Sequence, residues 1–107
     1  MKMKVELNFR ERVWMIVAAI PYGQVTTYGD VARLAGNSKA ARQVGGILSK
    51  LPEGSSLPWY RVVNRMGRIS LQGESLLRQR NALLAENIEI GPQHTISLAK
   101  YRWSGAE

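Results

Sequence analysis

The chain of 107 residues contains no cysteine and a single histidine, His94. The absence of cysteine excludes disulfide bonds, thiolate metal sites and thiol nucleophiles. One histidine without any cysteine is too little for a zinc site, and nothing resembles the nucleophile elbow of a Ser-His-Asp hydrolase. The sequence therefore predicts no metal site, no cofactor and no catalytic residue.

Long apolar runs are missing as well. No stretch is long enough to span a bilayer, and none has the pattern of a basic amphipathic anchor. The basic start Met1-Lys2-Met3-Lys4 is not followed by the apolar core of a signal peptide. We therefore expect a cytoplasmic protein without membrane partners. There is no repeat or linker, and the length suits one domain over residues 1–107.

Positive charge is abundant and unevenly placed. The net charge is +7, and residues 31–80 alone carry nine Lys and Arg against two acids. The segments 1–30 and 81–107 sum to only +1 and −1. A basic surface confined to the middle of the chain suggests a polyanionic partner, and nucleic acid is favoured over a membrane.

Apolar residues at helical spacing predict three helices in the first half of the chain, over about 9–20, 28–35 and 38–50. Short polar side chains at their starts are suitable N-caps, namely Asn8, Thr26 or Thr27, and Ser38. The second and third helices are joined by a short turn that contains Gly36. This is a helix-turn-helix pattern, although many helical hairpins share it.

Two adjacent glycines, Gly45 and Gly46, fall inside the third predicted helix. Each glycine costs about 1 kcal/mol in a helix interior. The pair therefore suggests that something approaches the backbone closely, either another helix or a nucleic-acid backbone. Packing of another helix is the favoured interpretation.

A proline and two aromatic residues mark the centre of the chain, at Pro58-Trp59-Tyr60-Arg61. Proline fixes its own φ and disfavours helix at Leu57. The segment predicts a rigid, extended lead into a strand, with Trp59 and Tyr60 facing opposite ways. Two aromatic rings and a cation on a stiff frame suit a pocket for a base. A core tryptophan at the start of a strand is the alternative.

The residues after this segment predict a β-hairpin. Its strands are 61–63 and 68–71, and its turn is 64–67. Arg65 and Arg68 at the tip resemble the wing of a winged helix, or else form a solvated charged tip. A last helix over 74–87 is expected to turn four leucines inward, and a C-terminal tail docks on the body. The leucines are Leu76, Leu77, Leu83 and Leu84, and the docking residues are Ile96, Leu98, Tyr101 and Trp103. The expected fold is mainly α, a winged helix-turn-helix-like single domain with a short β-hairpin.

Four ordered motifs then resemble the DNA-binding domain of O6-alkylguanine-DNA alkyltransferases. They are Ile20-Pro21-Tyr22-Gly23, Thr27-Tyr28-Gly29, the run from Ala40 to Gly46, and the run from Pro58 to Val63. The repair enzymes carry a Pro-Cys-His-Arg-Val run, and here Trp59 stands in the cysteine position. That replacement resembles the alkyltransferase-like proteins, which bind alkylated guanine without repairing it and lack the enzymes' separate N-terminal domain. Tyr60 departs from the family pattern, which has histidine there.

The resemblance implies roles for particular residues. Tyr28 matches a tyrosine that crowds the target's 3′ phosphate and helps to rotate the nucleotide outward. Arg42 matches an arginine finger that fills the vacated place, from a helix that lies in the minor groove. The implied DNA-binding residues are Tyr28, Arg42, Thr27, Ser38, Ala41, Gln43 and Gly45. The implied lesion pocket comprises Trp59, Tyr60, Arg61, Val62, Val63 and Arg68.

The resemblance also implies a function. The expected protein is a non-enzymatic sensor, most simply a monomer, that binds duplex DNA containing O6-alkylguanine by nucleotide flipping. Because nothing is transferred, the bound lesion would be a signal for the damage-recognition proteins of nucleotide excision repair. The alternative is a winged-helix transcription regulator, for which the helix-turn-helix and the basic charge suffice.

Overall fold

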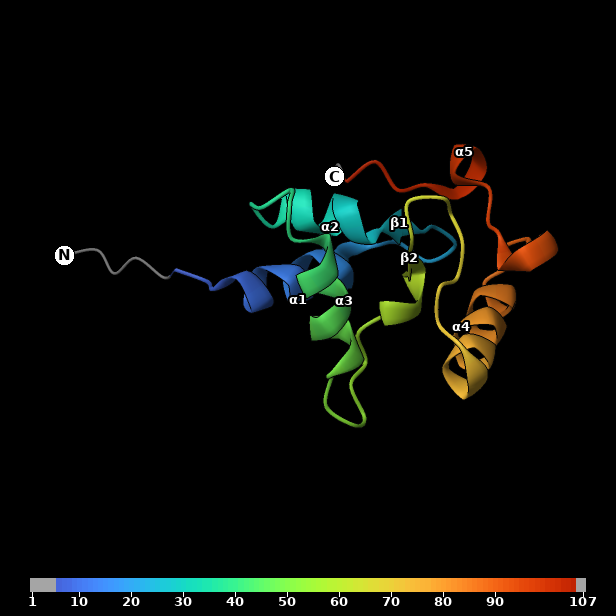
Figure 1. The fold of residues 1–107 in the computed structure, drawn as a ribbon, viewed down its shortest axis with the longest axis horizontal. Helices are drawn as coiled ribbons and strands as arrows, with labels where there is room; N and C mark the ends of the chain where they lie inside the picture. Colours follow the sequence, from blue (N-terminus) through green and yellow to red (C-terminus); the bar gives the residue numbers. More distant parts are fainter. Residues whose placement is uncertain (1–5, 106–107) are drawn as a thin grey trace.

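Five α-helices and one pair of very short strands organise residues 6–105, the part of the chain that this computed structural model describes (Figure 1). The basic segment Met1–Lys4, in which no export signal is predicted, lies outside the described residues. The α-helices are α1 (Phe9–Ala19), α2 (Tyr28–Leu34), α3 (Ala41–Ser49), α4 (Gly73–Ala85) and α5 (Leu98–Tyr101). Two 3₁₀ helices, η1 (Trp59–Arg61) and η2 (Pro92–His94), and the strands β1 (Thr26–Thr27) and β2 (Val62–Val63) complete the fold. The predicted mainly helical class is confirmed.

Helices α1, α2 and α3 form the first of two apolar clusters. A capping box starts α1, because Asn8 Oδ1 accepts the Glu11 N–H at 2.8 Å and Glu11 Oε1 accepts the Asn8 N–H at 3.0 Å. Thr27 caps α2 by accepting the Asp30 N–H at 3.0 Å. The helices bury mainly valine and alanine, small residues that let α2 and α3 lie close together.

The third helix begins later than predicted. It starts at Ala41, with Ala40 as an N-cap that makes no side-chain hydrogen bond, so the predicted cap at Ser38 is wrong. Ser38 instead lies in a turn that Asn37 closes, since the Asn37 side chain accepts the Lys39 N–H and its carbonyl accepts the Ala40 N–H. The asparagine side chain thus competes with the helix for these backbone groups.

The two strands pair in parallel, with Thr26 opposite Val62 and Thr27 opposite Val63. The predicted hairpin is therefore not formed, although its turn is. Asn64 Oδ1 accepts the N–H groups of Met66 and Arg68, each at 2.9 Å, which closes the turn. The chain beyond the turn then bonds to the C-terminal segment, where Ile69 N–H donates to the His94 carbonyl at 3.0 Å. The chain after the turn therefore bonds to the distant C-terminal segment and does not form a second hairpin strand.

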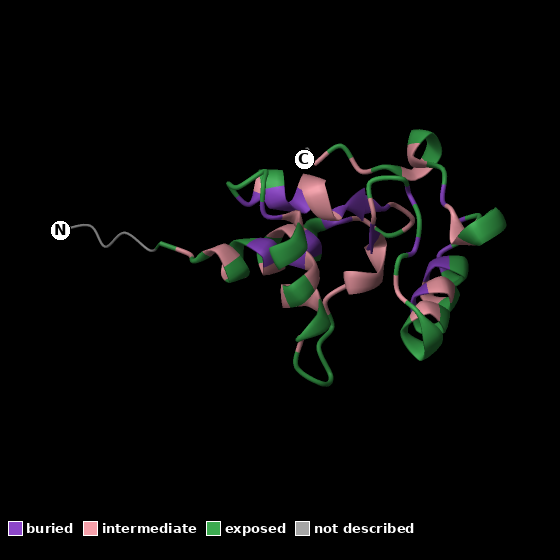
Figure 2. Ribbon diagram, viewed as in Figure 1, coloured by how far each residue is buried: buried purple, intermediate pink, exposed green. Residues whose placement is uncertain are grey.

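Helix α4 and the C-terminal segment enclose the second apolar cluster, which includes Val63, Leu83 and Ile96 (Figure 2). Leu83 is buried as expected, but Leu77 and Leu84 are 56% and 43% exposed, so their predicted inward orientation is wrong. Gln79 takes an inward position instead. The predicted docking of the tail is confirmed by backbone hydrogen bonds from Val25 to Tyr101 and from Trp103 to Val25.

Residues 6–105 contain neither a candidate membrane span nor a candidate metal site. No helix there is both long and apolar enough to cross a membrane. No group of three or more His, Cys, Asp or Glu side chains is placed to hold a metal ion within this range.

Candidate nucleic-acid interface

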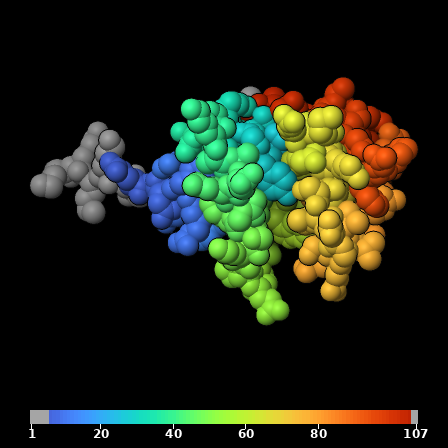
Figure 3. All heavy atoms as spheres, in the orientation of Figure 1, coloured from blue at the N-terminus to red at the C-terminus, as the bar shows by residue number. Residues whose placement is uncertain are grey.

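A cavity of about 550 Å³ opens between α3 with the loop that follows it, η1, and the start of α4. In the space-filling view the green loop stands away from the orange α4, with the hollow between them (Figure 3). Its volume lies within the range of about 300–1,000 Å³ that small-molecule sites occupy. The lining residues are Tyr28, Gly45, Leu48, Ser49, Leu51, Pro52, Glu53, Gly54, Ser55, Trp59, Leu71, Ser75 and Arg78.

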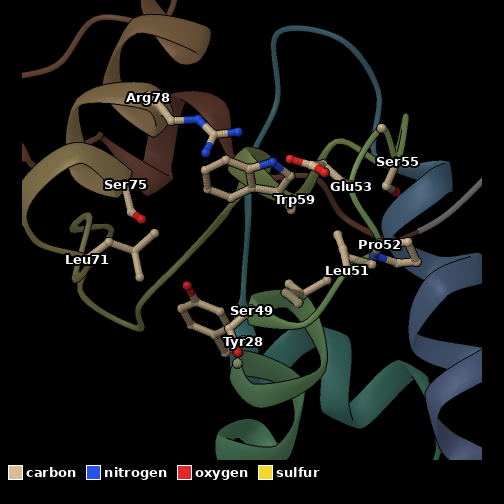
Figure 4. Close-up of a pocket in the computed structure, with 13 residues that line it drawn as sticks. Tyr28, Ser49, Leu51, Pro52, Glu53, Ser55, Trp59, Leu71, Ser75 and Arg78 are labelled. Carbon is tan, nitrogen blue, oxygen red and sulfur yellow. The ribbon is translucent and has the colours of Figure 1, made fainter.

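Trp59 forms one wall of this cavity (Figure 4). It is half-buried, and it follows an inverse γ-turn at Pro58, whose φ of −79° and ψ of 63° bring the Trp59 N–H to 2.8 Å from the Leu57 carbonyl. The chain then enters η1, so the extended conformation predicted for this segment is wrong. The rings of Trp59 and Tyr60 meet edge to face, with centroids 5.9 Å apart and planes at 84°. The turn leaves Trp59 facing the cavity.

Tyr60 and Arg61 lie behind this wall, bonded to Glu86 at the end of α4. The Tyr60 hydroxyl donates to Glu86 Oε2 at 3.1 Å, and Arg61 Nη2 donates to the same oxygen at 2.6 Å. The Glu86 side chain also accepts the Gly23 N–H at 2.8 Å. Burial alone would raise the pKa of Glu86, but the hydrogen bonds from Arg61 and Gly23 hold it below its ordinary value. Burial and the bond to Glu86 raise the pKa of Tyr60.

The other residues expected in the lesion pocket also lie away from the cavity lining. Val62 and Val63 are 0% and 1% exposed, because β2 is enclosed between the two apolar clusters. Arg68 is exposed and forms an isolated bridge with Thr95. Of the six predicted pocket residues, only Trp59 lines this cavity.

Several residues expected to contact DNA gather on α2, α3 and the turn between them. Arg42 and Gln43 are exposed in the first turn of α3, Ser38 is exposed in the preceding turn, and Ala41 is half-buried. Within residues 6–105, the Arg42 side chain has no hydrogen-bond or ion-pair partner in the structure. Thr27 is buried and uses its hydroxyl as the cap of α2.

Tyr28 and Gly45 join the two predicted groups of residues, because both line the cavity that Trp59 also lines. Tyr28 is the first residue of α2, and burial raises the pKa of its hydroxyl. A Cβ built on Gly45 would lie 3.9 Å from Tyr28 Cε1, which is ordinary contact, and one on Gly46 would meet no atom within 4 Å. Close packing of another helix on these glycines is therefore wrong. Gly45 is half-buried and faces the cavity beside Tyr28, whereas Gly46 is exposed and lies beside Trp14 and Gln43.

Sequence reasoning missed the far wall of the cavity. Leu71, Ser75 and Arg78 come from the start of α4 and the segment before it, where the sequence predicted only a helix with inward leucines. The sequence predicted no part of the site in the loop 52–55. The short distance in sequence between this loop and Trp59 was the one available signal, because residues close in sequence are also close in space.

The arrangement can bind a planar aromatic group but cannot take an alkyl group from it. Trp59 and Tyr28 offer aromatic surface, and the walls add leucine and serine side chains. No thiol is present anywhere in the chain, and an indole ring is no substitute for a thiolate nucleophile. A helix-turn-helix with a basic face beside an aromatic cavity defines a DNA-binding protein that accommodates a base.

Comparisons with known proteins agree with this class. Residues 8–88 match the family described as "6-O-methylguanine DNA methyltransferase, DNA binding domain". The chain is 63% identical over 103 residues to the DNA base-flipping protein of Escherichia coli K12, covering 96% of this chain and 80% of that protein. It is 38% identical over 102 residues to alkyltransferase-like protein 1 of Schizosaccharomyces pombe, covering 90% and 94%.

A solved structure is similar over the same range. The S. pombe protein, crystallised with damaged DNA containing O6-carboxymethylguanine, superimposes with a TM-score of 0.84 at 37% identity and covers 90% of this chain and 94% of that one. The chain belongs to the alkyltransferase-like branch of the 6-O-methylguanine DNA methyltransferase family. Its sequence contains no cysteine, so it has no thiol that could accept an alkyl group.

Proposed function

We propose that this protein is a sensor of DNA damage that binds O6-alkylguanine in duplex DNA by rotating the nucleotide out of the helix. The relatives support this proposal, because one is named a DNA base-flipping protein and another was crystallised with DNA containing O6-carboxymethylguanine. The observation that carries it is the cavity in which Trp59 stands, beside Tyr28 and the open face of α3. The everted base occupies this cavity.

The energetics favour damaged guanine over normal guanine. Extruding a base costs a few kcal/mol, and less where pairing is already weakened. An O6-alkyl group removes a Watson–Crick donor from guanine, so the lesion is cheaper to extrude. Arg42, exposed and without a partner among the described residues, fills the vacated place in the stack. Stacking on an aromatic side chain contributes about 1–3 kcal/mol per base, which Trp59 supplies.

Helix α3 lies in the minor groove in this proposal. Its exposed first turn carries Arg42 and Gln43, with Ser38 and Ala41 beside them, and its glycine face lets the DNA backbone approach. The basic middle segment 31–80 neutralises phosphates, which gives affinity that is independent of sequence and falls steeply with salt. Tyr28 stands between this surface and the cavity, where it assists rotation of the nucleotide.

The bound lesion stays in the DNA, since the protein has no group that accepts the alkyl substituent. The distorted complex then serves as a signal for damage-recognition proteins of nucleotide excision repair. A transcription regulator is the weaker alternative. Such a regulator would use the hairpin over 61–71 as its wing. That hairpin is not formed, because β2 pairs with β1.

A binding comparison tests the proposal. Affinity is measured for two duplexes that are identical except for one O6-methylguanine, in several flanking sequences and at fixed salt. We expect a preference for the lesion that persists in every sequence context. A fluorescent base analogue beside the lesion reports unstacking on binding. Equal affinity for both duplexes in all contexts, or a preference for one sequence regardless of the lesion, contradicts the proposal.

A further inference from the structure

Two opposite charges stand on the walls of the cavity. Arg78 comes from α4 and Glu53 from the loop after α3, and the Trp59 ring lies between them (Figure 4). The guanidinium lies beside the six-membered ring of the indole, and the carboxylate lies toward the five-membered ring. The remaining described lining consists of Tyr28 with leucine, serine, glycine and proline residues. The cavity is therefore electrically asymmetric along the indole.

Arg78 differs in its partners from three other arginines of the C-terminal half, Arg61, Arg80 and Arg102. Arg61 is bound to Glu86, Arg102 to Asp30, and Arg80 Nη1 lies 3.2 Å from His94 Nδ1. Within residues 6–105, Arg78 has neither a hydrogen bond nor an ion pair. Its planar fork of N–H donors is therefore free, and this fork matches a carboxylate in a bidentate geometry.

The geometry points to Arg78 as the residue that selects O6 substituents by their charge. An alkyl group that ends in a carboxylate and extends toward α4 meets the free guanidinium, so it binds more tightly than a neutral group of the same shape. Glu53 acts in the opposite sense at the other end of the indole, where it disfavours an anionic group directed toward the loop. This inference rests on the proposed function, because it assumes that an O6-alkylguanine enters the cavity.

The test compares two lesions of equal shape in one duplex. They are O6-carboxymethylguanine and its neutral amide, O6-carbamoylmethylguanine. The ratio of the two dissociation constants cancels the phosphate contribution, which is common to both duplexes at fixed salt. We expect the unmodified protein to bind the acid lesion about three- to tenfold more tightly, the size of a charge-assisted bond in a partly open site.

Four variants assign that ratio to its residue. Arg78→Gln is expected to reduce it to about one, with little change for the amide lesion. Arg80→Gln removes an equal charge two residues away, beside His94, and is expected to leave the ratio unchanged. Glu53→Gln is expected to raise it, because the opposing charge is removed. Arg78→Lys keeps the charge without the fork and is expected to give an intermediate ratio.

The inference is overturned if Arg78→Gln keeps the ratio of the unmodified protein, or if Arg80→Gln lowers it by the same factor. If urea titration shows that Arg78→Gln does not fold, the other two variants test the inference. Arg78→Lys is then expected to lower the ratio of the dissociation constants, and Glu53→Gln is expected to raise it. Failure of the proposed function has a different signature. In that case neither lesion binds more tightly than unmodified guanine.

Discussion

Arg61 Nη2 lies 2.6 Å from Glu86 Oε2, and this ion pair ties the segment that carries Trp59 to the end of α4. The side chains are 13% and 6% exposed. Arg61 Nη1 also donates to the Ile20 carbonyl at 2.7 Å, which adds the end of α1 to the same junction. The pair therefore holds two walls of the cavity at a fixed separation, although neither residue lines it.

Glu86→Gln is expected to destabilise the protein by about 3–5 kcal/mol, because it leaves the buried Arg61 charge without its counter-ion. Urea unfolding measures the change. The control is Glu89→Gln, which breaks the ion pair with Lys100, whose side chains are 77% and 59% exposed. Such surface pairs contribute about 0–1 kcal/mol. Equal losses in the two variants would show that the Arg61–Glu86 pair does not stabilise the fold.

The same carboxylate predicts a loss of stability in acid. The pKa of Glu86 is lowered in the folded protein from its ordinary value of 4.5. A lowered pKa means that the unfolded chain binds the proton first, so the contribution is present above pH 4.5 and is lost as the pH falls through the folded value. Unfolding free energies measured from pH 7 to pH 3 should fall less in Glu86→Gln than in the unmodified protein. Parallel curves would contradict this assignment.

Gly46→Ala is expected to change stability and DNA binding in opposite directions. A Cβ at this position meets no protein atom within 4 Å, and alanine removes the entropic cost of glycine in a helix, about 0.5–1 kcal/mol. Unfolding free energy should rise by that amount. DNA affinity should fall, because the methyl group stands on the face that approaches the duplex.

The control for this variant is Asn81→Ala, on the exposed side of α4. It also improves helix propensity, by less than 1 kcal/mol, but lies outside the proposed interface. It should therefore stabilise the protein and leave binding unchanged. Unchanged DNA affinity in Gly46→Ala would mean that the duplex does not approach α3 at this point.

Arg42→Ala is expected to weaken binding of a lesion duplex by about tenfold while the unfolding free energy stays the same. The reason is that, in the proposed function, Arg42 fills the place of the extruded base and so offsets part of the stacking that is lost on extrusion. Arg65→Ala removes another exposed charge, from the turn after β2, and should cost much less. Loss of stability without loss of lesion preference would assign Arg42 a structural role.

Trp59→Cys is expected to gain little alkyl-transfer activity. A thiol with an ordinary pKa of about 8.5 is mostly protonated at neutral pH and needs a neighbouring base. Tyr60 occupies the position of the enzymes' histidine, but its hydroxyl donates to Glu86 and its pKa is raised. Adding Tyr60→His should increase transfer, measured as the mass of one methyl group on the protein. Rapid stoichiometric transfer to Trp59→Cys alone would contradict this reasoning.

The sequence by itself determined the four longer helices and the family. Helix caps are local signals, since a capping side chain bonds to backbone only two or three residues away. Asn8 and Glu11 cap α1 in this way, and Thr27 caps α2. The missing cysteine and the order of the four motifs are also properties of the chain alone. They defined a non-catalytic relative of the alkyltransferases before any contact was known.

Only the tertiary structure decided which partners the middle of the chain finds. The hairpin was plausible locally, yet β2 pairs with β1 from 36 residues earlier, as Thr26 lies opposite Val62. Gln79 faces inward and Leu77 outward because Gln79 Nε2 donates to the Val62 carbonyl at 2.9 Å, a bond that helical periodicity cannot foresee. The cavity is likewise a junction of segments distant in sequence. Its far wall, with Arg78, exists because long-range packing brings α4 opposite Trp59, and no local rule encodes that placement.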